Sequence, residues 1–157
     1  MTSDVSLTYS RTYPSGVDDA FDEVLAHDLT RLFDRRYAAI PPIKAVKDQA
    51  GAWGTPGQTR TIALADGGTM RESLIEVDRP GKFAYRISDI TGPMKPLVAG
   101  VEGAWTFEPA GTGVRITWSW NVRPAGRVGA LAMPVFRRMW EGYARKGFDN
   151  IERLLVR

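Results

Sequence analysis

Two polar residues near the middle of the chain, Glu72 and Tyr85, have side chains that could move protons on a bound molecule. Glu72 follows the turn signal Gly67-Gly68, where glycine tolerates the backbone angles of a tight hairpin. A two-residue turn would place Glu72 on one strand face with Thr61 and Ala63. A carboxylate that faces an apolar cavity has a raised pKa and can act as a general acid or base. Tyr85 could donate a hydrogen bond to a carbonyl or enol oxygen of a ligand.

Glu72 also has an ordinary structural interpretation. It could form an ion pair with Arg60 or Arg71, or it could face water. The hairpin that follows does not fix the parity of strand 70–77, and a shift of one residue would turn Arg71 inward instead of Glu72. The sequence therefore leaves open which of these two residues faces the interior.

Large apolar residues alternate along the strands beside Glu72 and Tyr85, which is typical of a sheet with one apolar face. If the last hairpin turns through residues 109–112, the inward residues of its two strands lie on the same face. Each of these residues could belong to the core, but so many Trp and Tyr side chains together favour a pocket for a planar or aromatic ligand. The predicted ligand contacts are Leu74, Phe83, Ile87, Trp105, Phe107, Trp118, Trp120, Phe136, Met139, Trp140 and Tyr143.

The elements that must position these side chains can be predicted from periodicity. Residues 5–13 alternate as a strand, two short helices follow between residues 17 and 36, and six strands separated by turns occupy residues 43–122. The last thirty residues, Arg127 to Arg157, predict a long amphipathic helix that starts or bends near Pro134. The apolar stripe of this helix is expected to comprise Val128, Leu131, Ala132, Val135, Phe136, Met139, Tyr143, Ile151 and Leu154.

This order of elements predicts a single α+β domain over residues 1–157. A curved seven-stranded antiparallel sheet would wrap around the long C-terminal helix, with the two short helices between strands 1 and 2. Because a sheet twists and bends, a long helix cannot contact all of it. A cavity is therefore expected between the sheet and the helix.

The composition excludes several other classes of function. The chain has no cysteine and one histidine, His27, so we expect neither a zinc site nor another metal site. No glycine-rich phosphate loop precedes a helix, and no cofactor is expected. The net charge of +3 comes from scattered arginines, which does not indicate a nucleic-acid partner. No apolar run is long enough to span a bilayer, and the N-terminus lacks the pattern of a signal peptide, so the cytoplasm is the expected compartment.

Three segments resemble the START-like (SRPBCC) superfamily, which has the helix-grip fold and includes polyketide cyclases and dehydrases, lipid-transfer domains and birch-pollen-allergen-like proteins. They are the loop 54–60, the hairpin and strand 66–80 with Tyr85 following, and the entry to the last strand at 109–118. The resemblance implies a pocket between sheet and helix. It does not imply a reaction, because the superfamily supports many functions on one scaffold.

Three functions are compatible with this resemblance, and the sequence favours the first. The protein could bind a hydrophobic ligand that is planar, aromatic, polyketide-like or lipid-like, without chemistry of its own. It could be a cyclase, aromatase or dehydratase in which Glu72 moves protons and Tyr85 polarises a carbonyl. It could also be a protein-interaction module of the co-chaperone kind. Trp53 and Met94, in Gly- and Pro-rich loops, could gate the cavity. The sequence does not decide whether the protein forms a homodimer.

Overall fold

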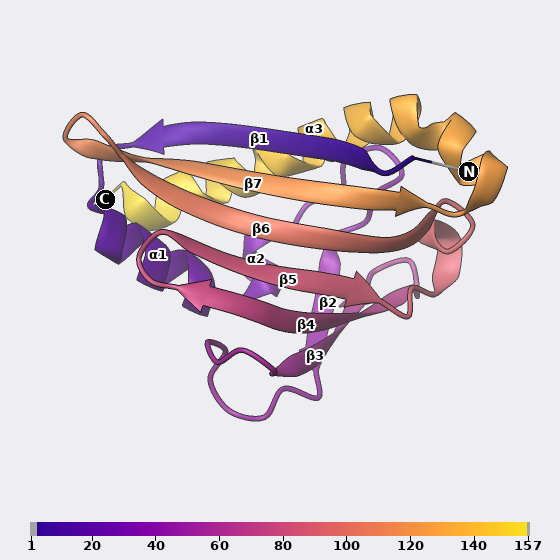
Figure 1. Ribbon diagram of the computed structural model, residues 1–157, viewed down its shortest axis with the longest axis horizontal. Coiled ribbons are helices and arrows are strands. Elements are labelled where there is room, and N and C mark those ends of the chain that lie inside the picture. The colour runs from indigo at the N-terminus through magenta and orange to yellow at the C-terminus, as the bar shows by residue number, and fades with distance from the viewer. Residues whose placement is uncertain (1–2, 157) are drawn as a thin grey trace.

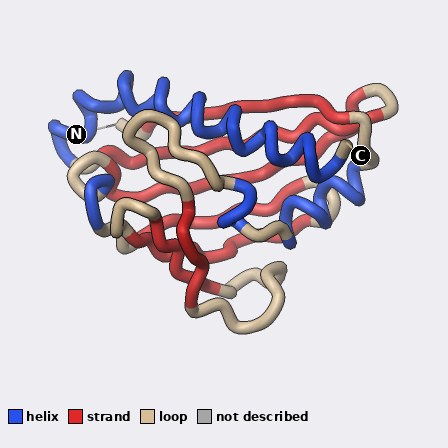
Figure 2. The backbone as a smooth tube through the Cα atoms, turned by 180° about the vertical axis from the view of Figure 1, so that it is seen from behind, coloured by secondary structure: helices blue, strands red, loops and turns tan. Residues whose placement is uncertain are grey.

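The computed structural model describes residues 3–156 and has the α+β, helix-grip architecture predicted from the sequence. Seven antiparallel strands form one sheet in the order β1-β7-β6-β5-β4-β3-β2, and α1 and α3 lie against one of its faces (Figures 1 and 2). The elements are β1 (Val5–Tyr13), α1 (Val17–Ala26), α2 (Leu29–Leu32), β2 (Ile43–Lys47), β3 (Thr59–Leu64), β4 (Thr69–Asp78), β5 (Lys82–Ser88), the 3-10 helix η1 (Gly92–Met94), β6 (Val98–Ala110), β7 (Gly113–Pro124) and α3 (Gly126–Leu155). Arg157, the predicted end of the last helix, lies outside the described residues.

The last hairpin has the inward face that its alternation predicts. Trp105 of β6 lies directly opposite Trp118 of β7, and both are buried. The turn is shorter than expected, because pairing continues to Ala110 and Gly113. Shortening the turn by two residues preserves the parity of both strands, since side chains alternate with a period of two.

Strand β4 turns Glu72 inward and so answers the question of parity that the sequence leaves open. Glu72 is buried beside buried neighbours on the same face, and Arg71 faces the other side. The expected same-face neighbours on β3, Thr61 and Ala63, were wrong. Glu72 pairs with Arg60, whereas Thr61 pairs with Arg71. A two-residue turn at Gly67-Gly68 would place Glu72 opposite Ala63, so the observed pairing with Arg60 shifts the register by three residues, an odd number that exchanges the two faces of β3 relative to Glu72.

Helix α3 runs as one element past Pro134, but its buried stripe differs from the predicted one in its first half. Val128, Leu131 and Val135 are 66%, 82% and 62% exposed. The reason lies at Gly129, where an added Cβ would come within 2.3 Å of the Leu97 carbonyl oxygen. The helix rests on the chain through this glycine, so residues on the opposite side of the first turns face outward. The buried residues of α3 with large side chains are Met133, Phe136, Trp140, Tyr143, Phe148 and Ile151.

Aromatic rings fill most of the space where α3 crosses the sheet. The centroid of the Trp118 ring lies 5.3 Å from that of Trp105 and 4.7 Å from that of Trp140, and Trp105 also stacks on Phe148 at 5.7 Å. This packing leaves little room directly beneath the helix. Over residues 3–156, no helix has the length and apolarity needed to cross a membrane.

Candidate ligand-binding cavity

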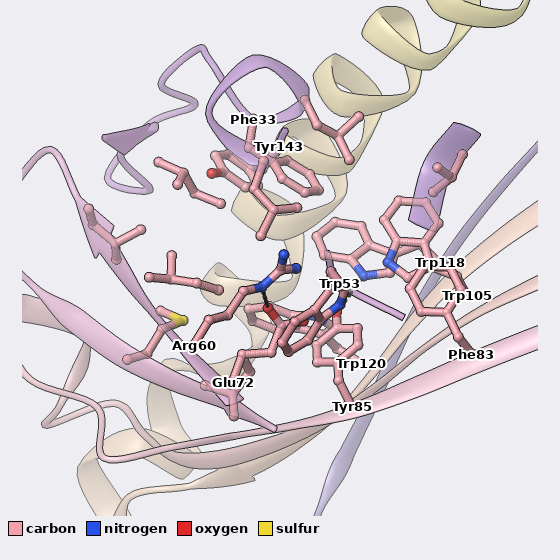
Figure 3. Close-up of a pocket in the computed structure, with 18 of the residues that line it drawn as sticks. Phe33, Trp53, Arg60, Glu72, Phe83, Tyr85, Trp105, Trp118, Trp120 and Tyr143 are labelled. Atoms are coloured by element: carbon pink, nitrogen blue, oxygen red, sulfur yellow. Dashed lines mark hydrogen bonds and ion pairs between the residues drawn. The ribbon is translucent and has the colours of Figure 1, made fainter. Parts of the chain in front are cut away.

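A cavity of about 70 Å³ lies beside the aromatic stack, between the inner face of β3 to β7 and the segment that connects α1 to β2 (Figure 3). Its wall is mainly apolar and aromatic. Arg60 and Glu72 are the charged side chains that reach it. The lining residues are Val24, Leu25, Leu29, Leu32, Phe33, Ile40, Ile43, Trp53, Arg60, Ile62, Leu64, Met70, Glu72, Phe83, Tyr85, Ile87, Met94, Trp105, Trp118, Trp120 and Tyr143.

The structure brings together on this wall most of the residues that the sequence singles out. From the sheet come Glu72, Phe83, Tyr85, Ile87, Trp105, Trp118 and Trp120. Tyr143 is the wall residue from α3, and the two predicted gate residues, Trp53 in the loop between β2 and β3 and Met94 in η1, also line the cavity. The predicted contacts Leu74, Phe107, Phe136, Met139 and Trp140 lie elsewhere. The reason is that Trp140 stacks on Trp118 and closes the space beneath α3, which moves the cavity toward β2 to β5.

Sequence reasoning missed the contribution of the segment from α1 to β2. Phe33 stacks on Tyr143, with ring centroids 5.2 Å apart, and also lies 5.0 Å from Trp118. The apolar faces of the two short helices were visible as a pattern, because Leu29, Leu32 and Phe33 follow helical spacing. Nothing in that pattern indicates that these residues close a cavity instead of extending the core.

Glu72 forms an ion pair inside the protein. Its Oε1 accepts a hydrogen bond of 2.6 Å from Nε of Arg60, and both side chains are less than a tenth exposed. The pair forms because the two residues face each other across β3 and β4. Burial raises the pKa of Glu72, and the charge of Arg60 and its hydrogen bond oppose that shift. The ion pair with Arg60 is one of the alternatives that the sequence leaves open for this carboxylate.

Tyr85 accepts two hydrogen bonds at its hydroxyl oxygen. Nε1 of Trp118 lies 2.7 Å away and Nε1 of Trp120 lies 2.8 Å away (Figure 3). Burial raises the pKa of Tyr85 above its ordinary value, so the hydroxyl stays protonated at neutral pH. Tyr85 can therefore act as a hydrogen-bond donor on the cavity wall.

Trp53 and Arg60 separate the cavity from a second hollow on its outer side. The second hollow has a volume of about 290 Å³ and shares Leu29, Trp53 and Arg60 with the inner cavity. The Arg60 guanidinium carbon lies 3.9 Å from the centre of the Trp53 ring, a cation–π contact, and Nη1 donates to Gln49 at 3.2 Å. The Trp53–Arg60 pair is therefore a partition between the two spaces.

The cavity is small for a drug-sized molecule. An engineered cavity of about 150 Å³ binds benzene, whereas one water takes a share of about 30 Å³ in the liquid. At about 70 Å³, a ring-sized ligand needs the wall to move outward. Within residues 3–156, no three acidic or histidine side chains gather closely enough to hold a metal ion.

Comparison with known proteins shows that the amino-acid sequence matches a known family. The family described as "Polyketide cyclase / dehydrase and lipid transport" matches residues 4–156 of the chain. No curated protein matches the sequence closely enough to count as a relative.

Solved structures share the fold at low sequence identity. Ginseng major latex-like protein 151 from Panax ginseng superposes with a TM-score of 0.72 at 11% identity, covering 98% of this chain and 99% of that one. Ara h 8.0201 gives 0.67 at 16% identity, covering 94% and 97%. DynU16, described as a putative protein in the dynemicin biosynthetic locus, gives a TM-score of 0.63 at 15% identity. The superposition covers 96% of this chain but only 48% of DynU16.

Proposed function

Because the chain belongs to the polyketide cyclase/dehydrase and lipid transport family, we propose that it binds a small hydrophobic molecule with a planar or aromatic part. The observation that carries this proposal is the cavity wall. Four tryptophans, two tyrosines and aliphatic side chains surround a space with few polar groups, which is how proteins bind apolar ligands. The description of the family, which names polyketide cyclases and dehydrases and lipid transport, is compatible with a polyketide-like or lipid-like ligand.

Binding can be measured through the tryptophans of the wall. Titration of the protein with acetophenone, naphthalene and palmitate should change the fluorescence of Trp118 and Trp120 for at least one of the three probes. Ile62→Phe, which enlarges a side chain on the wall, should weaken that response. Leu131→Phe, which makes a similar change at a residue that is 82% exposed, should not. The absence of a response to all three probes would contradict the proposal.

An enzyme of the cyclase or dehydratase type is the second candidate, because Glu72 and Tyr85 reach the same cavity. The ion pair with Arg60 argues for a structural role of Glu72, since that carboxylate already has a partner. An enzyme should lose turnover and keep ligand affinity in Glu72→Gln. A binding protein should show no turnover of any ligand that it binds.

A further inference from the structure

We infer that the hydrogen-bonded cluster of Tyr85, Trp118 and Trp120 recognises the acceptor oxygen of a ketone. The ligand class is then an aryl ketone, whose ring lies against the apolar wall and whose carbonyl oxygen accepts a hydrogen bond from the Tyr85 hydroxyl. This inference rests on the proposed function of the cavity and specifies the chemistry of its ligand.

The direction of the hydrogen bonds follows from the chemistry of the three side chains. An indole Nε1–H can only donate, so Trp118 and Trp120 are the donors in the contacts of 2.7 Å and 2.8 Å to Tyr85. A phenolic oxygen has two lone pairs, and these two bonds occupy both. The Tyr85 hydroxyl can therefore accept nothing more, and its remaining polar function is to donate its own hydrogen.

That hydrogen has no acceptor within the described chain. The hydrogen bonds of the Tyr85 side chain to residues 3–156 are those from Trp118 and Trp120. Glu72 is close enough to influence the pKa of Tyr85 through its charge, but it forms its hydrogen bond with Arg60. Buried hydroxyl groups are normally paired. A ligand oxygen in the cavity would supply the partner that the Tyr85 hydrogen lacks.

The backbone holds the cluster in place. Tyr85 of β5 lies opposite Gly103 of β6, and Gly103 lies opposite Trp120 of β7. A Cβ on Gly103 would come within 2.2 Å of Tyr85 Cζ and 2.5 Å of its hydroxyl oxygen. The ring therefore lies across β6 through the space that this glycine leaves, and reaches the two indoles. Trp118 is held in turn by stacking on Trp105 and Trp140.

The local electrostatics favour an acceptor over a donor. Two N–H groups point at the Tyr85 oxygen and make its O–H a stronger donor, because hydrogen bonds in a chain polarise one another. A ligand hydroxyl or amine that aimed its hydrogen at this point would find no free lone pair. Apart from the ion pair of Arg60 and Glu72, the rest of the wall is apolar and aromatic, so the ligand needs a flat apolar body that carries an acceptor oxygen, as an aryl ketone does.

The test compares two probes of nearly equal shape, acetophenone and α-methylstyrene, which differ by a C=O in place of a C=CH₂. Calorimetry gives the ratio of their association constants for the wild type. We expect Tyr85→Phe to lower the ketone-to-alkene ratio by roughly two- to tenfold, the range that one net hydrogen bond gives. Tyr13→Phe is the matched control, because its buried hydroxyl donates to the Phe148 carbonyl and does not line the cavity. It should leave the ratio unchanged.

A second variant tests the saturation of the lone pairs. Trp120→Phe removes one donor and frees one lone pair of Tyr85, so 1-phenylethanol should gain affinity relative to acetophenone. The inference is overturned if both probes bind and neither ratio changes, although the binding function then stands. If no probe binds at all, the proposed function fails and this inference fails with it. Bound acetophenone should also show a lower carbonyl stretching frequency in the wild type than in Tyr85→Phe.

Discussion

Arg60 and Glu72 face each other across β3 and β4, and Nε of the guanidinium lies 2.6 Å from Oε1 of the carboxylate in the protein interior. The two residues differ in the number of their contacts. Glu72 is held by Arg60, whereas Arg60 also stacks on Trp53 and donates to Gln49. The arginine thus connects the buried carboxylate with the loop that closes the cavity.

Removal of the arginine should make stability depend more strongly on pH than in the wild type, where burial already raises the pKa of Glu72. In Arg60→Met, Glu72 stays buried without a cation, so burial raises its pKa without opposition. The folded protein then holds the proton more tightly than the unfolded chain. The free energy of unfolding therefore falls as pH rises from the ordinary carboxyl pKa of about 4.3 through the raised value. At about pH 8 we expect a loss of about 3–5 kcal/mol, and at about pH 5 a smaller one, as measured by urea unfolding.

Two further variants control this experiment. Arg86→Met breaks the exposed contact of 3.5 Å with Glu102 and should change stability by about 0.5 kcal/mol or less at either pH. Arg60→Met combined with Glu72→Leu removes both charges and should restore most of the stability without the pH dependence. An equal loss in Arg60→Met at acidic and alkaline pH would show that ionisation of Glu72 is not the cause.

The fold could be predicted because side-chain alternation still gives the correct inward face when the length of a turn is wrong by an even number of residues. In the last hairpin, pairing runs two residues further than expected, and Trp105 and Trp118 still face inward because an even shift preserves parity. The direction of the Glu72 side chain was harder to predict, because a shift of one residue in strand register turns it to the other face of the sheet. Its direction depends on the register with Arg60, which single-strand alternation cannot reveal.

The position of the cavity could not be predicted from the same patterns. Trp140 and Tyr143 lie three residues apart on α3, yet Trp140 fills the core and Tyr143 lines the cavity. The difference arises because Phe33, from a segment more than a hundred residues earlier, stacks on Tyr143. Periodicity within one element gives its buried face, but not which parts of that face meet a solid core.

Substitution of two stacked tryptophans should separate packing from binding. Trp140 is fully buried, and its Nε1 has no hydrogen-bond partner within residues 3–156. Trp140→Phe therefore removes buried ring area without breaking a hydrogen bond. We expect it to lower the free energy of unfolding by less than truncation to alanine would, which typically costs about 3–5 kcal/mol. The affinity for acetophenone should change little. Trp118→Phe also removes the hydrogen bond to Tyr85 and should change both stability and affinity. Equal affinity changes in the two variants, measured by calorimetry, would contradict this division.

Gly103→Ala should disrupt the tyrosine cluster through sterics. The new Cβ would approach Tyr85 Cζ to 2.2 Å, so the ring must move away from the indoles. We expect a loss of about 1–3 kcal/mol from overpacking, seen in urea unfolding, together with a lower preference for acetophenone over α-methylstyrene. Gly54→Ala is the control, because its Cβ would lie 3.7 Å from the nearest side chain. Unchanged stability and preference in Gly103→Ala would show that the approach of Tyr85 to the backbone is not required.

The Trp53–Arg60 partition predicts where a ligand enters. Trp53 lines both the inner cavity and the outer hollow of about 290 Å³, so Trp53→Ala should join the two spaces. The association rate of acetophenone, followed by stopped-flow tryptophan fluorescence, should then rise severalfold, because entry no longer waits for the loop to move. Met94→Ala is the matched comparison, since Met94 lines the inner cavity from η1 and does not line the outer hollow. Faster association in Met94→Ala alone would place the entrance beside η1 and leave the indole of Trp53 as a fixed part of the wall.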